Sequence, residues 1–298
     1  MLLQSSVMVR PKALAYVALT KPRIIELLLI TTVPTMVVAE AGLPSVWLMV
    51  ATVVGGTLSA GGANAMNMYI DRDIDQLMKR TQGRPLVTGE LTPREALAFA
   101  IGIEVVSFVW LWGLVNLLSA VLAVGACLFY VFIYTLWLKR RSTQNIVIGG
   151  AAGAAPVLIG WAAVTNTVAW PAVVLFGLIF FWTPPHFWAL AIRYRTDYQA
   201  ASVPMLPAVA TLERTSREMI VYTVITVASA ELFGVLAHMG PVFHATSIAL
   251  GAVFLWMTVR LHRAHSPEGA MKVFHYSITY LTVLFLVMVL DVLVRHGI

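Results

Sequence analysis

Nine long apolar runs, separated by short connections, dominate this sequence of 298 residues. An α-helix needs about 20 residues to cross the hydrocarbon core of a bilayer, and each run is close to that length. Membrane barrels are excluded, because their strands are shorter and alternate apolar with polar residues. We therefore expect an all-α polytopic membrane protein whose helices surround a central cavity open to the cytoplasmic side, with one membrane domain over residues 1–298 and no soluble domain. The runs cover residues 24–42, 46–69, 95–115, 118–138, 144–164, 168–191, 217–237, 242–261 and 273–294.

Composition supports the membrane class. Hydrophobic residues make up 59% of the chain and charged residues only 11%, whereas soluble domains carry about 25% charged residues. The single cysteine, Cys127, lies within the fourth run. Disulfide, zinc and thiol chemistry are therefore not expected.

Basic residues occur in every second connection between the apolar runs. Of the 20 lysines and arginines, 19 lie in the N-terminal segment and the even-numbered connections, and only Arg295 falls on the other side. The positive-inside rule places the N-terminus in the cytoplasm and the C-terminus outside. We expect the cytoplasmic (inner) membrane of a bacterium. The net charge of +6 suits anionic lipids and substrates and does not suggest nucleic acid.

An acidic row closes the second run. Asn67, Asp71 and Asp75 are spaced by four residues, so a helix places them on one face, each about 6 Å beyond the last. Such oxygen ligands would hold a hard cation such as Mg²⁺, which can bridge to the oxygens of a lipid diphosphate. The alternative is a solvated helix end. Asp73 points away from the shared face and is assigned to that alternative.

Basic side chains follow the acidic row. Arg80 and Arg84 come within ten residues of it, and Lys139 and Arg140 follow the fourth run, five or six residues after Tyr134. Cations of this kind suit the outer oxygens of a diphosphate. The alternative is that the positive-inside rule alone places them there. We expect Pro85 and Gly89 to break any helix in this connection.

The sixth run carries two adjacent prolines, Pro184 and Pro185, followed by His186. Prolines inside a span are expected to break the backbone where it lines a cavity. His186 is either a hydrogen-bonded packing residue or a contact for an acceptor substrate. Asp197 is the sole acid between Glu104 and Glu213. A second cation there would need a backbone, water or phosphate ligand as well.

These residues resemble a known family. The acidic row is similar to the first aspartate-rich motif of the UbiA superfamily of intramembrane prenyltransferases, and further segments resemble the branch of that superfamily that modifies haem. Together the segments run in order from residue 19 to residue 207. They are residues 19–23, 67–75, 79–86, 145–150, 182–188 and 203–207.

The resemblance implies a reaction and roles. Farnesyl diphosphate would alkylate a vinyl group of haem b, water would add, and haem O would result for cytochrome oxidase. Asn67, Asp71 and Asp75 would hold Mg²⁺, with Asp197 as the candidate ligand of a second ion. Haem A synthase is the expected partner besides membrane lipid. The implied diphosphate contacts are Arg80, Arg84, Lys139 and Arg140, and the implied haem propionate contacts are Lys21 and Arg23.

The sequence departs from the superfamily in two places. Only Asp197 stands where a second aspartate-rich motif is usual, and Ser202 stands where a glycine is expected before Val203. Two alternatives stay open. One is a prenyltransferase for an aromatic acid or quinone precursor, which would share the metal row. The other is a nine-span transporter, although transporters place polar residues near the midplane rather than at one membrane face.

Overall fold

A computed structural model describes residues 11–297, without the side chains of residues 23–29. This part of the chain is helical and contains no strand. Eight of its helices are long and apolar enough to cross a membrane. The first predicted span corresponds to α2 (Pro22–Glu40), a helix of 19 residues whose described apolar stretch is Ile30–Glu40. The prediction of an all-α polytopic protein is therefore confirmed, and the boundaries shift by only a few residues.

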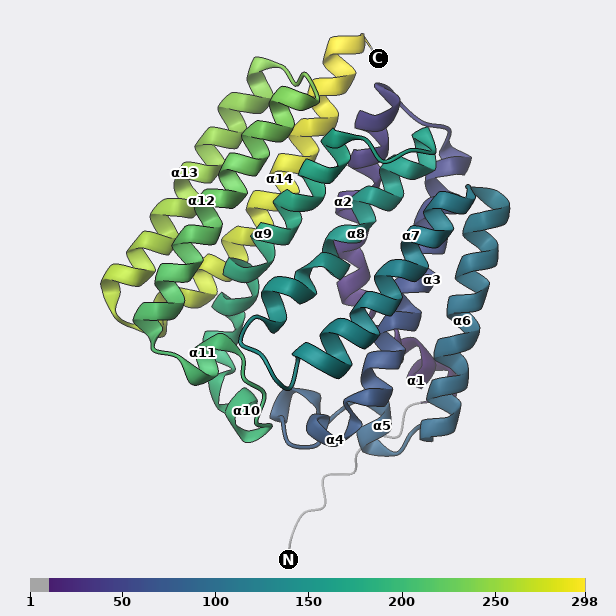
Figure 1. Ribbon diagram of the computed structural model, residues 1–298, viewed down its shortest axis with the longest axis vertical. Helices are drawn as coiled ribbons and strands as arrows, with labels where there is room; N and C mark the ends of the chain where they lie inside the picture. Colours follow the sequence, from purple (N-terminus) through teal and green to yellow (C-terminus); the bar gives the residue numbers. More distant parts are fainter. Residues whose placement is uncertain (1–10, 298) are drawn as a thin grey trace, which may run out of the picture.

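The long helices stand side by side, as Figure 1 shows. α12 and α13 form one flank, α6 and α3 form the other, and α8 and α9 run between them. α3 packs on α6, and α9 packs on both α8 and α12. The remaining long helices complete the bundle. The bounds are α3 Val46–Ile70, α6 Pro93–Leu114, α7 Leu117–Leu128, α8 Asn145–Thr165, α9 Trp170–Arg193, α12 Leu212–Leu236, α13 Pro241–Ala264 and α14 Ala270–His296.

Short helices gather at one end of the bundle, and the C-terminus lies at the opposite end (Figure 1). These short helices are α1 Lys12–Leu19, α4 Arg72–Asp75, η1 Lys79–Thr81, α5 Pro85–Thr88, α10 Arg195–Ala200, α11 Leu206–Val209 and η3 Pro267–Gly269. α1 precedes the first long helix, and each of the others follows the end of a long helix. Pro85 begins α5 rather than only breaking a helix, because proline suits the first helical position; Gly89 then ends it at a φ of 78°.

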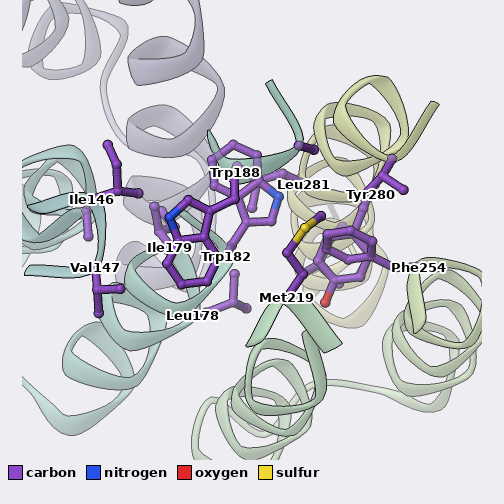
Figure 2. Close-up of a cluster of buried hydrophobic side chains, with 14 of the residues drawn as sticks. Ile146, Val147, Leu178, Ile179, Trp182, Trp188, Met219, Phe254, Tyr280 and Leu281 are labelled. Carbon is purple, nitrogen blue, oxygen red and sulfur yellow. The ribbon is translucent and has the colours of Figure 1, made fainter. Parts of the chain in front are cut away.

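The largest apolar core lies where α8, α9, α12, α13 and α14 meet. Figure 2 shows Trp182 and Trp188 of α9 between side chains of α8 and those of α12 and α14. Both tryptophans are buried, as are Phe254 and Tyr280. Many other large apolar residues, including Trp112 and Trp256, are exposed on the outer faces. Such a surface is what lipid requires, since lipid tails are as apolar as the side chains they cover.

Two helices differ from the prediction. α9 continues through Pro184 and Pro185 to Arg193, so the expected break is wrong. Neighbouring helices can compensate for the backbone bonds that prolines remove, and α9 packs on α8, α12 and α14 here. The fourth span changes from the α-helix α7 to a wider π-helical segment, η2 (Phe129–Leu138), which nothing in its apolar sequence signalled.

Candidate active site

Asn67, Asp71 and Asp75 lie along a nearly continuous helical path. α3 ends at Ile70 and α4 begins at Arg72, yet Asp71 N–H bonds the Asn67 carbonyl and Asp75 N–H bonds the Asp71 carbonyl, each at 2.9 Å. These bonds carry the helical spacing through the junction, so the three side chains share one face. They are 3%, 0% and 1% exposed. Buried carboxylates need compensating partners.

Two cations supply that compensation, and a third basic side chain contacts Asn67. Lys139 Nζ pairs with Asp71 Oδ2, and Arg84 lies 2.5 Å from Asp75 Oδ2. Lys21 Nζ donates to Asn67 Oδ1 at 2.9 Å. The cations come from the segment before α2, the first long connection and the end of η2, so segments distant in sequence converge here. The buried cluster holds more cations than carboxylates, which suits an additional anion.

Burial shifts the pKa values of these groups. It raises the pKa of Asp75, although Arg84 and Lys139 act in the opposite direction. It lowers the pKa of Lys139 against the attraction of Asp71. Lys21 has a pKa well below its ordinary value of 10.5, first because of burial and then because Arg84 and Lys139 repel its charge. A bound anion would relieve this repulsion among the cations.

Each carboxylate keeps one oxygen for another ligand. Asp71 Oδ1 and Asp75 Oδ1 are buried and have no hydrogen-bond partner among the described residues; Arg140 lies 3.5 Å from Asp71 Oδ1, within ion-pair range. Oxygen donors are what Mg²⁺ prefers, so these residues fit a divalent cation. Among the described side chains, no group of three acidic, histidine or cysteine residues is placed to hold a metal ion. Any remaining ligands would come from Asn67, water or a substrate.

Arg140 forms the outer wall of this cluster. Its guanidinium donates to both oxygens of Asp73 at 2.7 Å, and this pairing lowers the pKa of Asp73 to about 2. Asp73 is 60% exposed, in agreement with its predicted outward direction, but it has a defined partner. Next to it lies a cleft of about 420 Å³ lined by Ile70, Arg72, Asp73, Thr135, Leu136 and Arg140.

Arg80 lies in the first long connection and contacts residues of the second at this end of the bundle. Its backbone N–H donates to Asp197 Oδ2 at 3.3 Å, and its guanidinium donates to the Tyr198 hydroxyl at 3.0 Å. The guanidinium also lies over the rings of Tyr194 and Tyr198. Asp197 is therefore held near Arg80 and is 9% exposed. Its contact is with Arg80 and not with the acidic row.

The π-helical segment positions Lys139. The Lys139 N–H bonds the Tyr134 carbonyl, five residues back, at 2.8 Å. Thr135 Oγ1 accepts from Asn67 Nδ2 at 3.2 Å and donates to the Tyr130 carbonyl at 2.8 Å. π-helical turns are often found at functional sites. Here the wider turn allows η2 to present a hydroxyl and an ammonium group to the row.

Tyr134 of η2 and Thr183 of α9 both pack against glycines of α8. A Cβ at Gly149 would fall 2.3 Å from Tyr134 Cδ2, and one at Gly150 would fall 3.0 Å from Thr183 Cβ. The small residues of α8 thus let η2 and α9 approach closely. His186, one turn after Thr183, is buried and bonds Ser277 of α14 at 2.7 Å. The side chain of Arg23 lies outside the described residues.

Comparison with known proteins decides the family. The profile of the UbiA prenyltransferase family matches residues 28–288. The chain belongs to the UbiA prenyltransferase family. It is therefore an integral membrane enzyme, and the transporter alternative is set aside.

Relatives of this UbiA prenyltransferase cover nearly its whole length. A protoheme IX farnesyltransferase of Clavibacter michiganensis is 55% identical over 283 residues, covering 94% of this chain and 92% of the relative. One of Frankia alni is 55% identical over 278 residues, covering 92% and 96%.

Solved structures share the fold. Digeranylgeranylglyceryl phosphate synthase has a TM-score of 0.79 at 17% identity, over 94% of this chain and 98% of that one. A UbiA homologue from Archaeoglobus fulgidus bound to GPP and Mg²⁺ has a TM-score of 0.62 at 16% identity, over 92% and 99%.

Two residues that contact candidate site residues in this UbiA prenyltransferase were not identified from the sequence. Thr135 contacts Asn67, and Ser277 contacts His186. Neither stands out in the sequence, because Thr135 directly follows Tyr134 and Ser277 lies between Tyr276 and Thr279. Many hydroxyls in membrane helices bond only their own backbone, as Thr223 does here, so a hydroxyl in a span does not by itself identify a site residue.

Proposed function

We propose that this enzyme transfers the farnesyl group of farnesyl diphosphate to a vinyl group of haem b, giving haem O and diphosphate. One observation carries the proposal: relatives named protoheme IX farnesyltransferase share 55% of its residues over 92–94% of its length. The buried row, with carboxylate oxygens that lack hydrogen-bond partners among the described residues and with surrounding cations, supplies what a metal diphosphate needs.

The proposed roles follow from the contacts. Asn67, Asp71 and Asp75 would hold one Mg²⁺, and Asp197 is the candidate for a second. A bound Mg²⁺ would neutralise diphosphate charge and so stabilise the leaving group. Lys139, Arg84 and Lys21 surround the row and would bind the diphosphate oxygens. Arg140 and Arg80 would do so from the outer side, where each now has a protein partner that it could release.

The proposed reaction involves no net oxidation or reduction, so its bond changes balance without an oxidant or a reductant. The bond from farnesyl C1 to the diphosphate oxygen breaks, and both electrons leave with diphosphate. C1 then bonds the terminal vinyl carbon, water adds to the neighbouring carbon, and a proton is lost. Preorganised cations are effective here, because they stabilise developing negative charge without reorganising. The burial of the row keeps bulk water from the reactive allylic carbon.

The location and partner remain part of the proposal. Cytoplasmic placement of the end that carries the short helices and the row is supported by the distribution of basic residues. The N-terminus would then lie inside, the C-terminus outside, and the membrane would be the bacterial inner membrane. Haem A synthase is the proposed partner, since haem O must pass to the next enzyme of haem A formation. Tyr134 would line the prenyl side of the cavity.

The acceptor decides between the two prenyltransferase alternatives. Purified protein in detergent would receive farnesyl diphosphate and Mg²⁺ with haem b, with an aromatic acid, or with both. We expect a haem product heavier by a farnesyl and a hydroxyl group, and an unchanged aromatic acid. A prenylated aromatic acid with unmodified haem would overturn the proposal.

A further inference from the structure

His186 is held between two aromatic rings. The Trp182 ring stacks on one face of the imidazole, with centroids 4.2 Å apart and planes 18° apart, and the Phe274 ring of α14 stacks near it at 4.6 Å and 26°. The Trp182 indole is itself anchored, because its N–H donates to the Ser277 carbonyl at 2.9 Å. This packing fixes the directions in which the two ring nitrogens point.

The hydrogen bonds around Ser277 determine which nitrogen carries the proton. Ser277 Oγ lies 2.6 Å from the Phe274 carbonyl oxygen and 2.7 Å from His186 Nδ1. Two oxygens at 2.6 Å need a hydrogen between them, and the serine hydroxyl has only one. That hydrogen is therefore donated to the carbonyl. The contact with His186 must then use Nδ1–H as the donor, and the neutral imidazole presents a lone pair at Nε2.

Nε2 has no hydrogen-bond partner among the side chains that the structure describes, and His186 keeps 7% of its surface accessible. A neutral imidazole whose other nitrogen donates to a fixed oxygen is the usual arrangement of a metal-binding histidine. Imidazole suits iron, whereas the oxygen ligands of the acidic row suit Mg²⁺. The two candidate sites thus differ in the metal that each would accept.

We propose that His186 Nε2 binds the iron of the haem acceptor as an axial ligand, and that Ser277 is a positioning residue that fixes the required tautomer. The inference rests on the proposed function and adds how haem is held. Iron bound at His186 anchors the porphyrin at one fixed point. Close contact of α9 with α8, and of α8 with η2, links that point to the helix end that carries Lys139.

Haem binding alone tests the inference, without prenyl transfer. Purified full-length protein would be titrated with haem b in detergent, without farnesyl diphosphate, and followed by absorption and resonance Raman spectra. We expect an iron–imidazole spectrum for the unaltered protein. His186→Gln should lose that spectrum and bind haem at least about 10–100-fold more weakly, since loss of a hydrogen-bond partner of a ligand alone usually costs that much. Added imidazole should restore the spectrum in His186→Gly.

His262 offers a matched control. It bonds Ser216 at 2.9 Å, as His186 bonds Ser277, but its ring is not enclosed between two stacked aromatic rings. His262→Ala should keep both the spectrum and the affinity. Ser277→Ala should keep an iron–imidazole bond but shift its stretching frequency, because the tautomer is no longer fixed. A merely structural serine would lower stability and leave the frequency unchanged.

The outcomes separate the two proposals. Mg²⁺-dependent binding of farnesyl diphosphate by His186→Gln would show that the variant is folded. An unchanged haem spectrum in that variant would overturn the assignment of His186 and leave the proposed function standing. Failure of the unaltered protein to bind haem at all would overturn the proposed function as well.

Discussion

Lys21 and Asn67 are 46 residues apart in sequence, and Lys21 Nζ donates to Asn67 Oδ1 at 2.9 Å. Lys21 has a φ of 53°, in the left-handed region that non-glycine residues rarely adopt, and Pro22 begins α2 immediately after it. Strain of this kind persists where the surrounding structure enforces it, often at functional sites. The contact brings Lys21 to the acidic row, whereas the family resemblance implied a haem propionate.

Replacing Lys21 should therefore affect the diphosphate substrate. Lys21→Met is expected to raise KM for farnesyl diphosphate roughly 10-fold, which corresponds to the loss of one charge-assisted hydrogen bond. The affinity for haem b should not change. Steady-state kinetics and haem titration would measure the two effects, with Lys12→Met as control, since Lys12 is 64% exposed and pairs with Glu95. A loss of haem affinity with unchanged KM would assign Lys21 to the propionates.

Lys139→Met should be more damaging, because it removes the buried cation that pairs with Asp71 and leaves only Arg140, at 3.5 Å, to compensate this carboxylate. Breaking a buried ion pair costs about 3–5 kcal/mol, and loss of a preorganised cation lowers kcat about 100-fold or more. Thermal unfolding and single-turnover rates would measure these effects. Arg141→Met is the control, since Arg141 is exposed two residues away. Equal rates for the two variants would remove Lys139 from the site.

Ser202 offers a stabilising substitution. It has a φ of 52°, and its side chain is exposed. A left-handed conformation costs a non-glycine residue about 1–2 kcal/mol, so Ser202→Gly should raise the thermal midpoint in detergent. Gly89→Ala should lower the thermal midpoint, because Gly89 has a φ of 78°, which alanine rarely adopts. Nothing lies within 4 Å of a Cβ at Gly89, so the loss would come from the backbone alone. A lower midpoint for Ser202→Gly would show that the backbone strain is not real.

Substitutions at two glycines of α8 test whether η2 packs closely on this helix. A Cβ at Gly149 would overlap the Tyr134 ring, while nothing lies within 4 Å of a Cβ at Gly153. Overpacking costs about 1–3 kcal/mol, so Gly149→Ala should lower the thermal midpoint and prenyl transfer by displacing η2. Gly153→Ala should change neither. The same small effect in both variants would argue against close contact of η2 with α8.

The features that could be predicted from the sequence depend on the spacing of residues that are close together in the chain. The spans follow from the apolar runs, and the shared face of Asn67, Asp71 and Asp75 follows from spacing by four residues, because the helical hydrogen bonds continue through the junction at Asp71. Both depend only on neighbouring residues. Arg80 and Arg84 were selected for the same reason, because they follow the row within ten residues.

The partners within the site could not be predicted. Lys139 pairs with Asp71 across 68 residues, and Arg80 approaches Asp197 across 117. Such contacts depend on how helices pack. The π-helical turn that directs Lys139 inward leaves no signal in an apolar run. The continuous course of α9 through Pro184 and Pro185 likewise depends on its neighbours.

Single-turnover product analysis tests the central claim most directly. Protein in excess over haem b would receive farnesyl diphosphate and Mg²⁺, in parallel with Asp71→Ala and with an EDTA-treated sample. The account predicts a haem product heavier by a farnesyl and a hydroxyl group in the first sample only. The same product at similar yield from Asp71→Ala, or in EDTA, would contradict the assignment of the acidic row as the metal diphosphate site.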